Sequence, residues 1–263
     1  MADRVITVSY DKIYSYCGGD LMLEIKDLSY TVDDKGTSKT IIDNLNLCIP
    51  DEKFVVITGP NGGGKSTLAR LIMGINPSTS GQIIFDGEDI TGSNITERAN
   101  KGISFAFQQP VHFKGIKVVD LLRIAAGKNI SVTEACDYLS KVGLCARDYI
   151  DREVNASLSG GELKRIEIAT VLARGTKFAI FDEPEAGIDL WSFQNLIKVF
   201  ENIRTNINGT ILIISHQERI LNIADEIIVI ENGRVKEQGT KEEMLPVILH
   251  SPFTMSGSCD KLS

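Results

Sequence analysis

Short apolar runs, each bounded by a turn or a glycine, divide the first third of the chain into expected strands. Alternation of apolar and polar residues predicts a strand over 23–32, and a second is predicted through 41–47 after a polar turn. Residues 54–57 form a continuous apolar run, which favours a buried strand, and residues 82–87 have a hairpin pattern. We therefore expect an antiparallel β patch followed by a buried strand.

A helical insertion is expected in the middle of the chain. After a predicted strand over 101–109, residues 117–150 have helical periodicity. Ser131 and Glu134 have the spacing of a capping box, and Gly143 is a plausible helix stop. We place this helical subdomain at about 109–173.

The last third returns to buried strands, predicted over 178–181 and 210–215. Residues 226–235 then predict a hairpin whose Asn232-Gly233 pair favours a type I′ turn. A helix and a Ser/Gly-rich coil are expected to follow. The main domain is expected over 22–245, with an N-terminal extension at 1–21 and a C-terminal tail at 246–263.

Composition narrows the classes of protein to consider. With 263 residues, 43% of them hydrophobic, the chain can bury a full core as one large domain or two lobes. No apolar run approaches the roughly 18 residues that span a bilayer, and residues 1–21 lack the features of a signal peptide. A net charge of −7 without basic clusters gives no support for nucleic-acid binding. We expect a cytoplasmic protein whose only route to a membrane is a partner.

The cysteines suggest neither a disulfide framework nor a zinc finger, because their number is odd and no C-x-x-C pair occurs. The five are Cys17, Cys48, Cys136, Cys145 and Cys259. We expect most of them to be small buried thiols in a reducing compartment. Only Cys259, in the tail, is expected to be exposed.

The most informative stretch is a G-x-x-x-x-G-K-[ST] loop between the buried strand at 54–57 and a helical pattern at 68–73. Its residues are Gly59, Pro60, Asn61, Gly62, Gly63, Gly64, Lys65, Ser66 and Thr67. In this context the loop amides and the helix N-terminus can bind phosphate. Lys65 would reach the β- and γ-phosphates, and Ser66 would ligate Mg²⁺. A chance match is on the order of one in a hundred from average residue usage, so we predict nucleotide binding.

Polar residues follow two of the later buried strands. Asp182, after the apolar run at 178–181, is placed to hold Mg²⁺, and the adjacent Glu183 could polarise an attacking water. Elsewhere an Asp-Glu pair would usually be a solvated strand end. His216 follows the strand at 210–215, at the edge where α/β sheets bind ligands, although a lone histidine is more often structural.

A second anion site is suggested at residues 158–165. Ser159 can cap the following helix and Glu162 can complete a capping box, which by itself describes an ordinary helix start. However, Gly160 and Gly161 have no side chains to cover the backbone amides at the helix N-terminus, so an anion could bind there. No second phosphate-loop lysine accompanies this site. Tyr30, upstream of the phosphate loop, could stack on a base or be a half-buried strand tyrosine.

Together these residues resemble the ATP-binding-cassette (ABC) ATPases over residues 22–245. The shared elements, in order, are GPNGGGKST, Gln108, LSGGE, FAIFDE, the turn at 185–189 and His216. LSGGE is the specific one, because other phosphate-loop families lack it. The resemblance implies an α/β fold: an ABC-type nucleotide-binding domain with a RecA-like core, an antiparallel β subdomain and a helical subdomain.

The resemblance also implies a role for each residue on the ATP side of the site. Tyr30 would stack on adenine, and Gln108 would sense both Mg²⁺ and the attacking water. Asp182 would be the Mg²⁺-associated carboxylate, Glu183 the catalytic base and His216 the γ-phosphate contact. ATP and Mg²⁺ are the expected cofactors.

The remaining motif residues are implied to act between two copies of the chain. Ser159, Gly160, Gly161 and Glu162 would contact ATP held by a second copy or a homologous subunit, and Asp189 would lie in the dimer-contacting D-loop. A monomer would place no LSGGE segment on its own γ-phosphate, so weak hydrolysis is expected from the isolated chain.

Within the family, three details resemble SufC, the ATPase of the SUF iron–sulfur assembly system. They are residues 107–110 followed by a loop with Gly115, the acidic Glu185, and the short helical insertion and tail similar to the archaeal and anaerobe type. The implied partner is a soluble SufB-like scaffold docking near Gln108 and residues 110–130, which ATP-driven closure would remodel. The cysteines of this chain would not be cluster ligands.

Two other functions remain open. Most proteins with this set of motifs drive membrane transporters, so the chain could be a transporter's ATP-binding subunit. It could instead be a non-hydrolysing ATP-dependent clamp or adaptor, although Glu183 argues against this because a clamp needs no catalytic base.

Overall fold

The computed structural model describes residues 20–249 apart from 35, 110 and 207–208. Most of the expected extension and tail, with Cys17 and Cys259, therefore lies outside the described residues. The chain forms two compact units. Of the described residues, unit 1 comprises those within 20–72, 76–92 and 216–249, and unit 2 those within 73–75 and 93–215.

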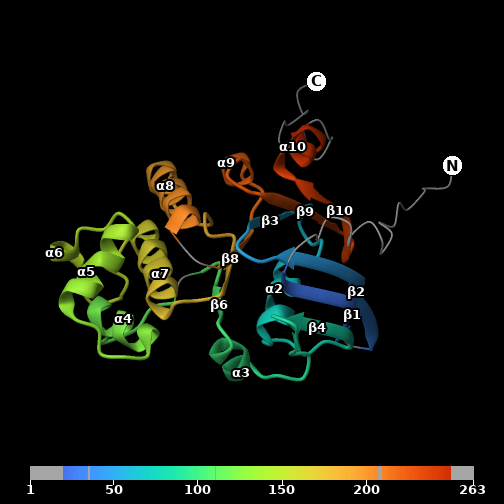
Figure 1. The fold of residues 1–263 in the computed structure, drawn as a ribbon, viewed down its shortest axis with the longest axis horizontal. Coiled ribbons are helices and arrows are strands. Elements are labelled where there is room, and N and C mark those ends of the chain that lie inside the picture. The colour runs from blue at the N-terminus through green and yellow to red at the C-terminus, as the bar shows by residue number, and fades with distance from the viewer. Residues whose placement is uncertain (1–19, 35, 110, 207–208, 250–263) are drawn as a thin grey trace. The chain divides into compact units, whose positions relative to one another are not determined.

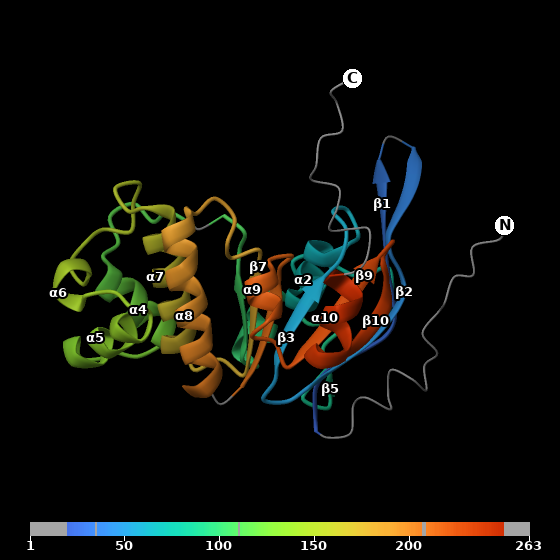
Figure 2. The same cartoon turned by 90° about the horizontal axis from the view of Figure 1, so that it is seen from above.

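Unit 1 begins with a four-stranded antiparallel sheet in the order β2-β1-β4-β5. Its strands are β1 (Leu21–Asp34), β2 (Thr37–Pro50), β4 (Ser80–Phe85) and β5 (Glu88–Asp89). Figure 2 shows β1 and β2 side by side as a long blue hairpin. Leu23 pairs with Ile49 on one side and Phe85 on the other, and all three are buried. The predicted antiparallel β patch is confirmed.

The rest of unit 1 surrounds the buried strand β3 (Phe54–Thr58). This strand pairs in parallel with β9 (Glu226–Glu231), which is antiparallel to β10 (Arg234–Thr240). The helices are α2 (Lys65–Met73), α9 (Glu218–Leu221) and α10 (Lys241–Leu249). Asn232 and Gly233 have φ values of 52° and 74°, as the two central residues of a type I′ turn require, so the predicted hairpin is confirmed.

Unit 2 contains three parallel strands in the order β8-β7-β6 and a group of helices. The strands are β6 (Ile103–Ala106), β7 (Phe178–Asp182) and β8 (Thr210–Ile214). The helices are α3 (Ile95–Asn100), α4 (Val118–Ala126), α5 (Val132–Lys141), α6 (Ala146–Tyr149), α7 (Gly160–Arg174) and α8 (Leu190–Asn206). Helices α4 to α7 gather in Figure 1, with α4 and α5 packed on α7.

Several element boundaries differ from the predicted ones. Strand β6 ends at Ala106, short of the predicted 109, and region 117–150 is divided into α4, α5 and α6. Helices α3, α8 and α9 are not among the predicted elements. Apolar periodicity is a weak guide here because short helices such as α3 and α9 complete few turns.

The capping box at Ser131 is confirmed. The Ser131 hydroxyl accepts from the Glu134 amide at 3.1 Å, and the Glu134 carboxylate accepts from the Ser131 amide at 2.8 Å. These bonds, led by the Ser131 amide, lower the pKa of Glu134. Gly143, with φ 69°, lies just beyond the end of α5, as a stop residue should.

Cys136 and Cys145 are free, but Cys136 is half-buried and Cys145 is exposed. The prediction that only Cys259 would be exposed is therefore wrong. Cys48 is fully buried but disulfide-bonded, so it is not one of the buried thiols that were expected for most of the cysteines. Within the described part of the chain, no helix is long and apolar enough to cross a membrane.

The capping box predicts a specific sensitivity of α5. Ser131→Ala removes the acceptor for the Glu134 amide, which leaves a helix-end donor without its protein partner. We expect the melting temperature followed by circular dichroism to fall by about 3 °C. Ser140→Ala, at an exposed serine in the last turn of α5, is the matched control and should cause no fall. Equal melting temperatures for the two variants would contradict the capping role.

Candidate active site

The predicted phosphate loop joins β3 to α2 in unit 1. Gly59 has φ 132°, and a Cβ there would lie 2.0 Å from the Ile230 carbonyl oxygen in β9. Gly64 has φ 102°, and its Cβ would lie 2.8 Å from Ile42 Cδ1 in β2. Only glycine fits both the backbone angles and the close contacts at these two positions. The loop is therefore shaped by the strands packed against it.

Lys65 folds back over the loop that precedes it. Its side-chain ammonium donates hydrogen bonds to the carbonyl oxygens of Gly59 at 2.9 Å and Pro60 at 3.0 Å. The residue is only 6% exposed, and α2 begins at it. A buried positive charge at a helix N-terminus is the electrostatic environment that a bound phosphate requires.

The turn between β9 and β10 supports the same loop. The Gly233 amide donates to the Gly63 carbonyl at 3.0 Å, and the Gly233 carbonyl accepts from the Asp43 amide at 3.1 Å. The next residue, Arg234, forms an ion pair with the Asp43 carboxylate at 2.7 Å. The hairpin turn thus connects β2 to the phosphate loop.

Tyr30 and His216, the other predicted site residues in unit 1, have different surroundings. Tyr30 is half-buried in β1 and pairs with Ile42, the residue whose side chain contacts Gly64. This pairing links its strand to the phosphate loop. His216 is exposed just after β8, and its Nε2 lies 3.5 Å from the Gln217 amide nitrogen.

Asp182, Glu183 and Gln108 belong to unit 2. Asp182 is the last residue of β7 and is 3% exposed. Glu183 has φ 43°, a left-handed conformation uncommon for a residue with a side chain, and its amide donates to the Ile214 carbonyl of β8 at 3.0 Å. The Gln108 amide nitrogen donates to Glu183 Oε2 at 2.6 Å. The strand end and Gln108 thus jointly orient this carboxylate.

The LSGGE segment forms the start of α7. Ser159 is its N-cap, and Glu162 completes the capping box, as predicted. Ser159 and Gly160 are exposed, whereas Gly161 is buried, with its Cβ position 2.5 Å from Ser192 Cβ in α8. The start of α7 is therefore packed closely against the start of α8.

Asp189 caps the N-terminus of α8. Its carboxylate accepts from the Trp191 and Ser192 amides at 2.9 and 3.0 Å and from the Ser192 hydroxyl at 2.7 Å. The Ser192 hydroxyl is the largest cause of the lowered pKa of Asp189. Leu190 and Trp191, beside it, are 64% and 77% exposed.

A small pocket within unit 2 brings Gln108 together with the LSGGE segment. It has a volume of about 260 Å³, and its lining residues are Gln108, Gln109, Gly160, Lys164, Ala186, Gly187 and Ile188. Two of the predicted site residues, Gln108 and Gly160, therefore share one cavity.

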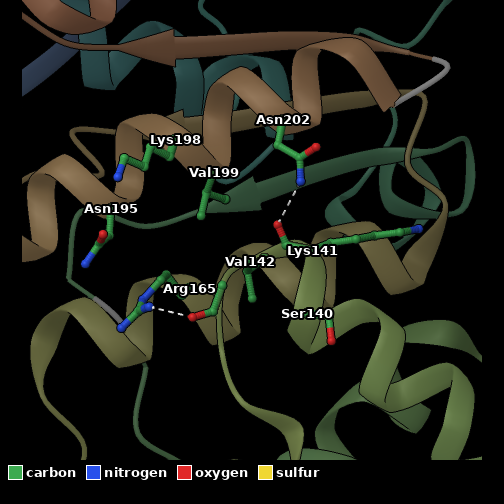
Figure 3. A pocket seen from close by; sticks show the side chains of 9 residues that line it. Ser140, Lys141, Val142, Arg165, Asn195, Lys198, Val199 and Asn202 are labelled. Carbon is green, nitrogen blue, oxygen red and sulfur yellow. Dashed lines mark hydrogen bonds between the residues drawn. The ribbon is translucent and has the colours of Figure 1, made fainter.

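A second cavity, of about 270 Å³, lies between the end of α5 and helices α7 and α8 (Figure 3). Arg165 donates to the Gly143 carbonyl at 3.0 Å and Asn202 to the Lys141 carbonyl at 3.3 Å. Arg165 also donates to the Gly161 carbonyl at 3.2 Å. Its lining includes none of the predicted site residues, and its polar groups chiefly satisfy the carbonyls at the end of α5.

Three neighbours of the predicted residues were not identified from the sequence. Tyr149 donates a hydrogen bond to Glu162, Gly233 supports the phosphate loop, and Lys164 contacts the backbone beside Gln108. Only Lys164 could have been noticed in the sequence, because a charged residue there interrupts the apolar face of α7 one turn before Ile168. The Gly233 contact joins segments that are distant in sequence, and the Tyr149 contact depends on the path of the loop between α6 and α7.

Comparison with known proteins places these features in a family. A family model described as ABC transporter matches residues 42–186. An uncharacterized ABC transporter ATP-binding protein of Methanocaldococcus jannaschii is 38% identical over 85% of this chain and 91% of its own length. A probable ATP-dependent transporter, ycf16, of Antithamnion sp. is 35% identical over 82% of this chain and 90% of its own.

A solved structure matches the fold as well. An ATP-binding cassette in a dimeric post-hydrolysis state, bound to ADP and phosphate, superposes with a TM-score of 0.74. The match covers 84% of this chain and 99% of that one, at 22% identity. The predicted ABC-type nucleotide-binding fold is confirmed.

The Tyr149–Glu162 hydrogen bond predicts a pH-dependent stability. Burial raises the pKa of Glu162, but bonds from Tyr149 and Ser159 and the charge of Arg152 outweigh it, so the pKa is lowered. Such a carboxyl stabilises the fold above its unfolded pKa of about 4.3, and the stabilisation is lost as pH falls through the folded pKa. Tyr149→Phe should therefore cost about 1 kcal/mol at pH 7 and less below about pH 4.

Urea denaturation across that pH range measures the difference between Tyr149→Phe and the wild type. Tyr138→Phe, at a tyrosine in α5 whose ring faces Lys141, is the control and should behave like the wild type at every pH. A Tyr149→Phe deficit independent of pH would show that the hydroxyl does not stabilise the Glu162 carboxylate.

Proposed function

The chain belongs to the ABC transporter family of ATP-binding ATPases, and on this premise we propose that two copies act together to convert ATP hydrolysis into movement of a partner. The observation that carries the catalytic part is the 2.6 Å hydrogen bond from Gln108 to Glu183. A carboxylate held at the end of a buried strand in a left-handed conformation matches the requirements of a positioned general base.

The proposed roles follow from the chemistry of each group. Glu183 accepts a proton from the attacking water, and Gln108 keeps its carboxylate oriented. Lys65 and the phosphate-loop amides bind the phosphates, and His216 contacts the γ-phosphate. Tyr30 stacks on the adenine.

The donors proposed for Mg²⁺ suit that ion. Mg²⁺ prefers oxygen ligands, and Ser66, Asp182 and Gln108 can supply a hydroxyl, a buried carboxylate and an amide oxygen. Because the amide nitrogen of Gln108 is bonded to Glu183, its oxygen remains the group for a cation. When bound, the ion would neutralise developing charge on the phosphates.

The proposed dimer is supported by the start of α7. Ser159 and Gly160 are exposed, and helix N-termini favour anions, so this segment can meet an ATP presented by another copy. Gly161 and Glu162 would support that contact from within the helix start. Asp189, with the exposed Leu190 and Trp191 after it, would contact the second copy nearby. A non-hydrolysing clamp is disfavoured because it would not need the Gln108–Glu183 arrangement.

The names of the relatives favour a membrane transporter as the partner assembly. One relative is named an ABC transporter ATP-binding protein and another a probable ATP-dependent transporter, and both match over most of their length. This supports the transporter alternative better than the SUF assignment. In that case the chain would bind the cytoplasmic side of a permease.

A SufB-like soluble scaffold is the second candidate, supported by residues of this chain. The Ser215 hydroxyl donates to Glu185 Oε1 at 2.5 Å, so the SufC-like acidic residue is tied to the residue before His216. Phe107 and Val111, in the expected docking region, are 41% and 49% exposed. Because Phe107 directly precedes Gln108, which is bonded to Glu183, a partner that contacts Phe107 could act on the candidate base.

Glu183→Gln tests the catalytic proposal. The amide keeps the shape of the side chain but cannot accept the proton, so steady-state turnover should fall at least about 100-fold. ATP binding should persist, and light scattering should detect an ATP-bound dimer. Glu201→Gln, at an exposed position of α8, is the control and should leave turnover unchanged. Wild-type turnover in Glu183→Gln would refute the assignment of the base.

Native co-purification distinguishes the two partners. The tagged chain is purified from its own cells with and without detergent, and captured proteins are identified by mass spectrometry against an untagged control. A transporter partner predicts an integral membrane protein that needs detergent. A soluble β-rich scaffold recovered equally in both preparations would contradict the transporter proposal and support the SUF one.

A further inference from the structure

An ion pair on α7, formed by Lys164 and Glu167, contacts the backbone of Phe107, the residue that precedes Gln108. The Lys164 ammonium donates to the Phe107 carbonyl and to Glu167 Oε2, the latter at 3.1 Å. The Phe107 carbonyl is therefore bonded to an ion pair on the helix that begins with the LSGGE segment.

This ion pair is largely buried, and burying charged groups carries a desolvation penalty. The Lys164 side chain is 2% exposed and that of Glu167 17%, and burial raises the pKa of Glu167 against the opposing effect of Lys164. Lys164 shares a face of α7 with the buried Ile168 and Val171, where an apolar residue would be expected. Buried ion pairs seldom stabilise a fold better than apolar residues of similar size, so a pair kept here indicates a requirement for defined geometry.

We propose that Lys164 and Glu167 are positioning residues for the catalytic base. By holding Phe107, they keep Gln108 within hydrogen-bonding reach of Glu183. Lys164 lies about one turn beyond Gly160, so the orientation of the LSGGE segment and that of the base are set through one helix. The inference rests on the proposed function, because it assumes that Glu183 is the base.

The test compares removal of one charge with removal of both in the full chain. Lys164→Met leaves the Glu167 charge buried and is expected to lower stability as well as activity. Lys164→Met/Glu167→Leu removes the pair without an orphan charge and should fold normally. We expect its kcat to fall about tenfold or more with KM for ATP unchanged within about twofold, because orientation is lost but the phosphate loop is not altered.

Two further variants separate positioning from packing. Lys164→Arg retains a donor and should recover most of the lost kcat. Arg123→Met is the matched control, since Arg123 also donates to a backbone carbonyl, that of Ile130 at 3.3 Å, and pairs with an acid three residues away, Asp120 at 3.4 Å. It should leave kcat within about twofold of the wild type.

The result that would overturn the inference is a normally folded double variant with wild-type kcat while Glu183→Gln is inactive. A double variant whose lower rate is fully explained by its unfolded fraction would overturn it too. If Glu183→Gln itself retains turnover, the assignment of the base has failed, and the inference fails with it for that separate reason.

Discussion

Burial of the parallel strands is the constraint on which the predicted site residues of each unit depend. Every residue of β7 and of β8 is buried, and so is every residue of β3. A strand covered on both faces can present polar groups only where it ends. Asp182 ends β7, His216 follows β8 after one residue, and Gly59 follows β3. The predicted site residues therefore lie at strand ends because the strands are inaccessible elsewhere.

Close contacts with neighbouring elements determine the backbone conformation at two glycines of the predicted motifs. Gly59 lies against the Ile230 carbonyl, and Gly161 lies against Ser192. At each position an added methyl group would have to displace a neighbouring element. These glycines of the phosphate loop and of LSGGE therefore serve packing, and a substitution at either would disturb it.

Much of the fold could be predicted from the sequence, and the site residues named from it remain a prediction. The hairpin at Asn232-Gly233, the Ser131 and Ser159 caps and the buried strands all rest on interactions between residues near each other in the chain. The boundary of β6 could not be predicted, because Phe107 leaves the strand to bond with α7. The helices α3, α8 and α9 were missed, and so were the disulfide bond of Cys48 and the exposure of Cys145.

The sequence by itself determined the family, the phosphate loop, the candidate base and the LSGGE helix start, because these are short motifs with local geometry. Only the tertiary structure decided how the carboxylate of this candidate base is held. Gln108 and Glu183 are 75 residues apart, and the bond between Phe107 and α7 spans more than 50 residues. Such contacts depend on how strands and helices pack, and no local pattern encodes them. The orientation of the proposed catalytic group is therefore a property of the folded unit.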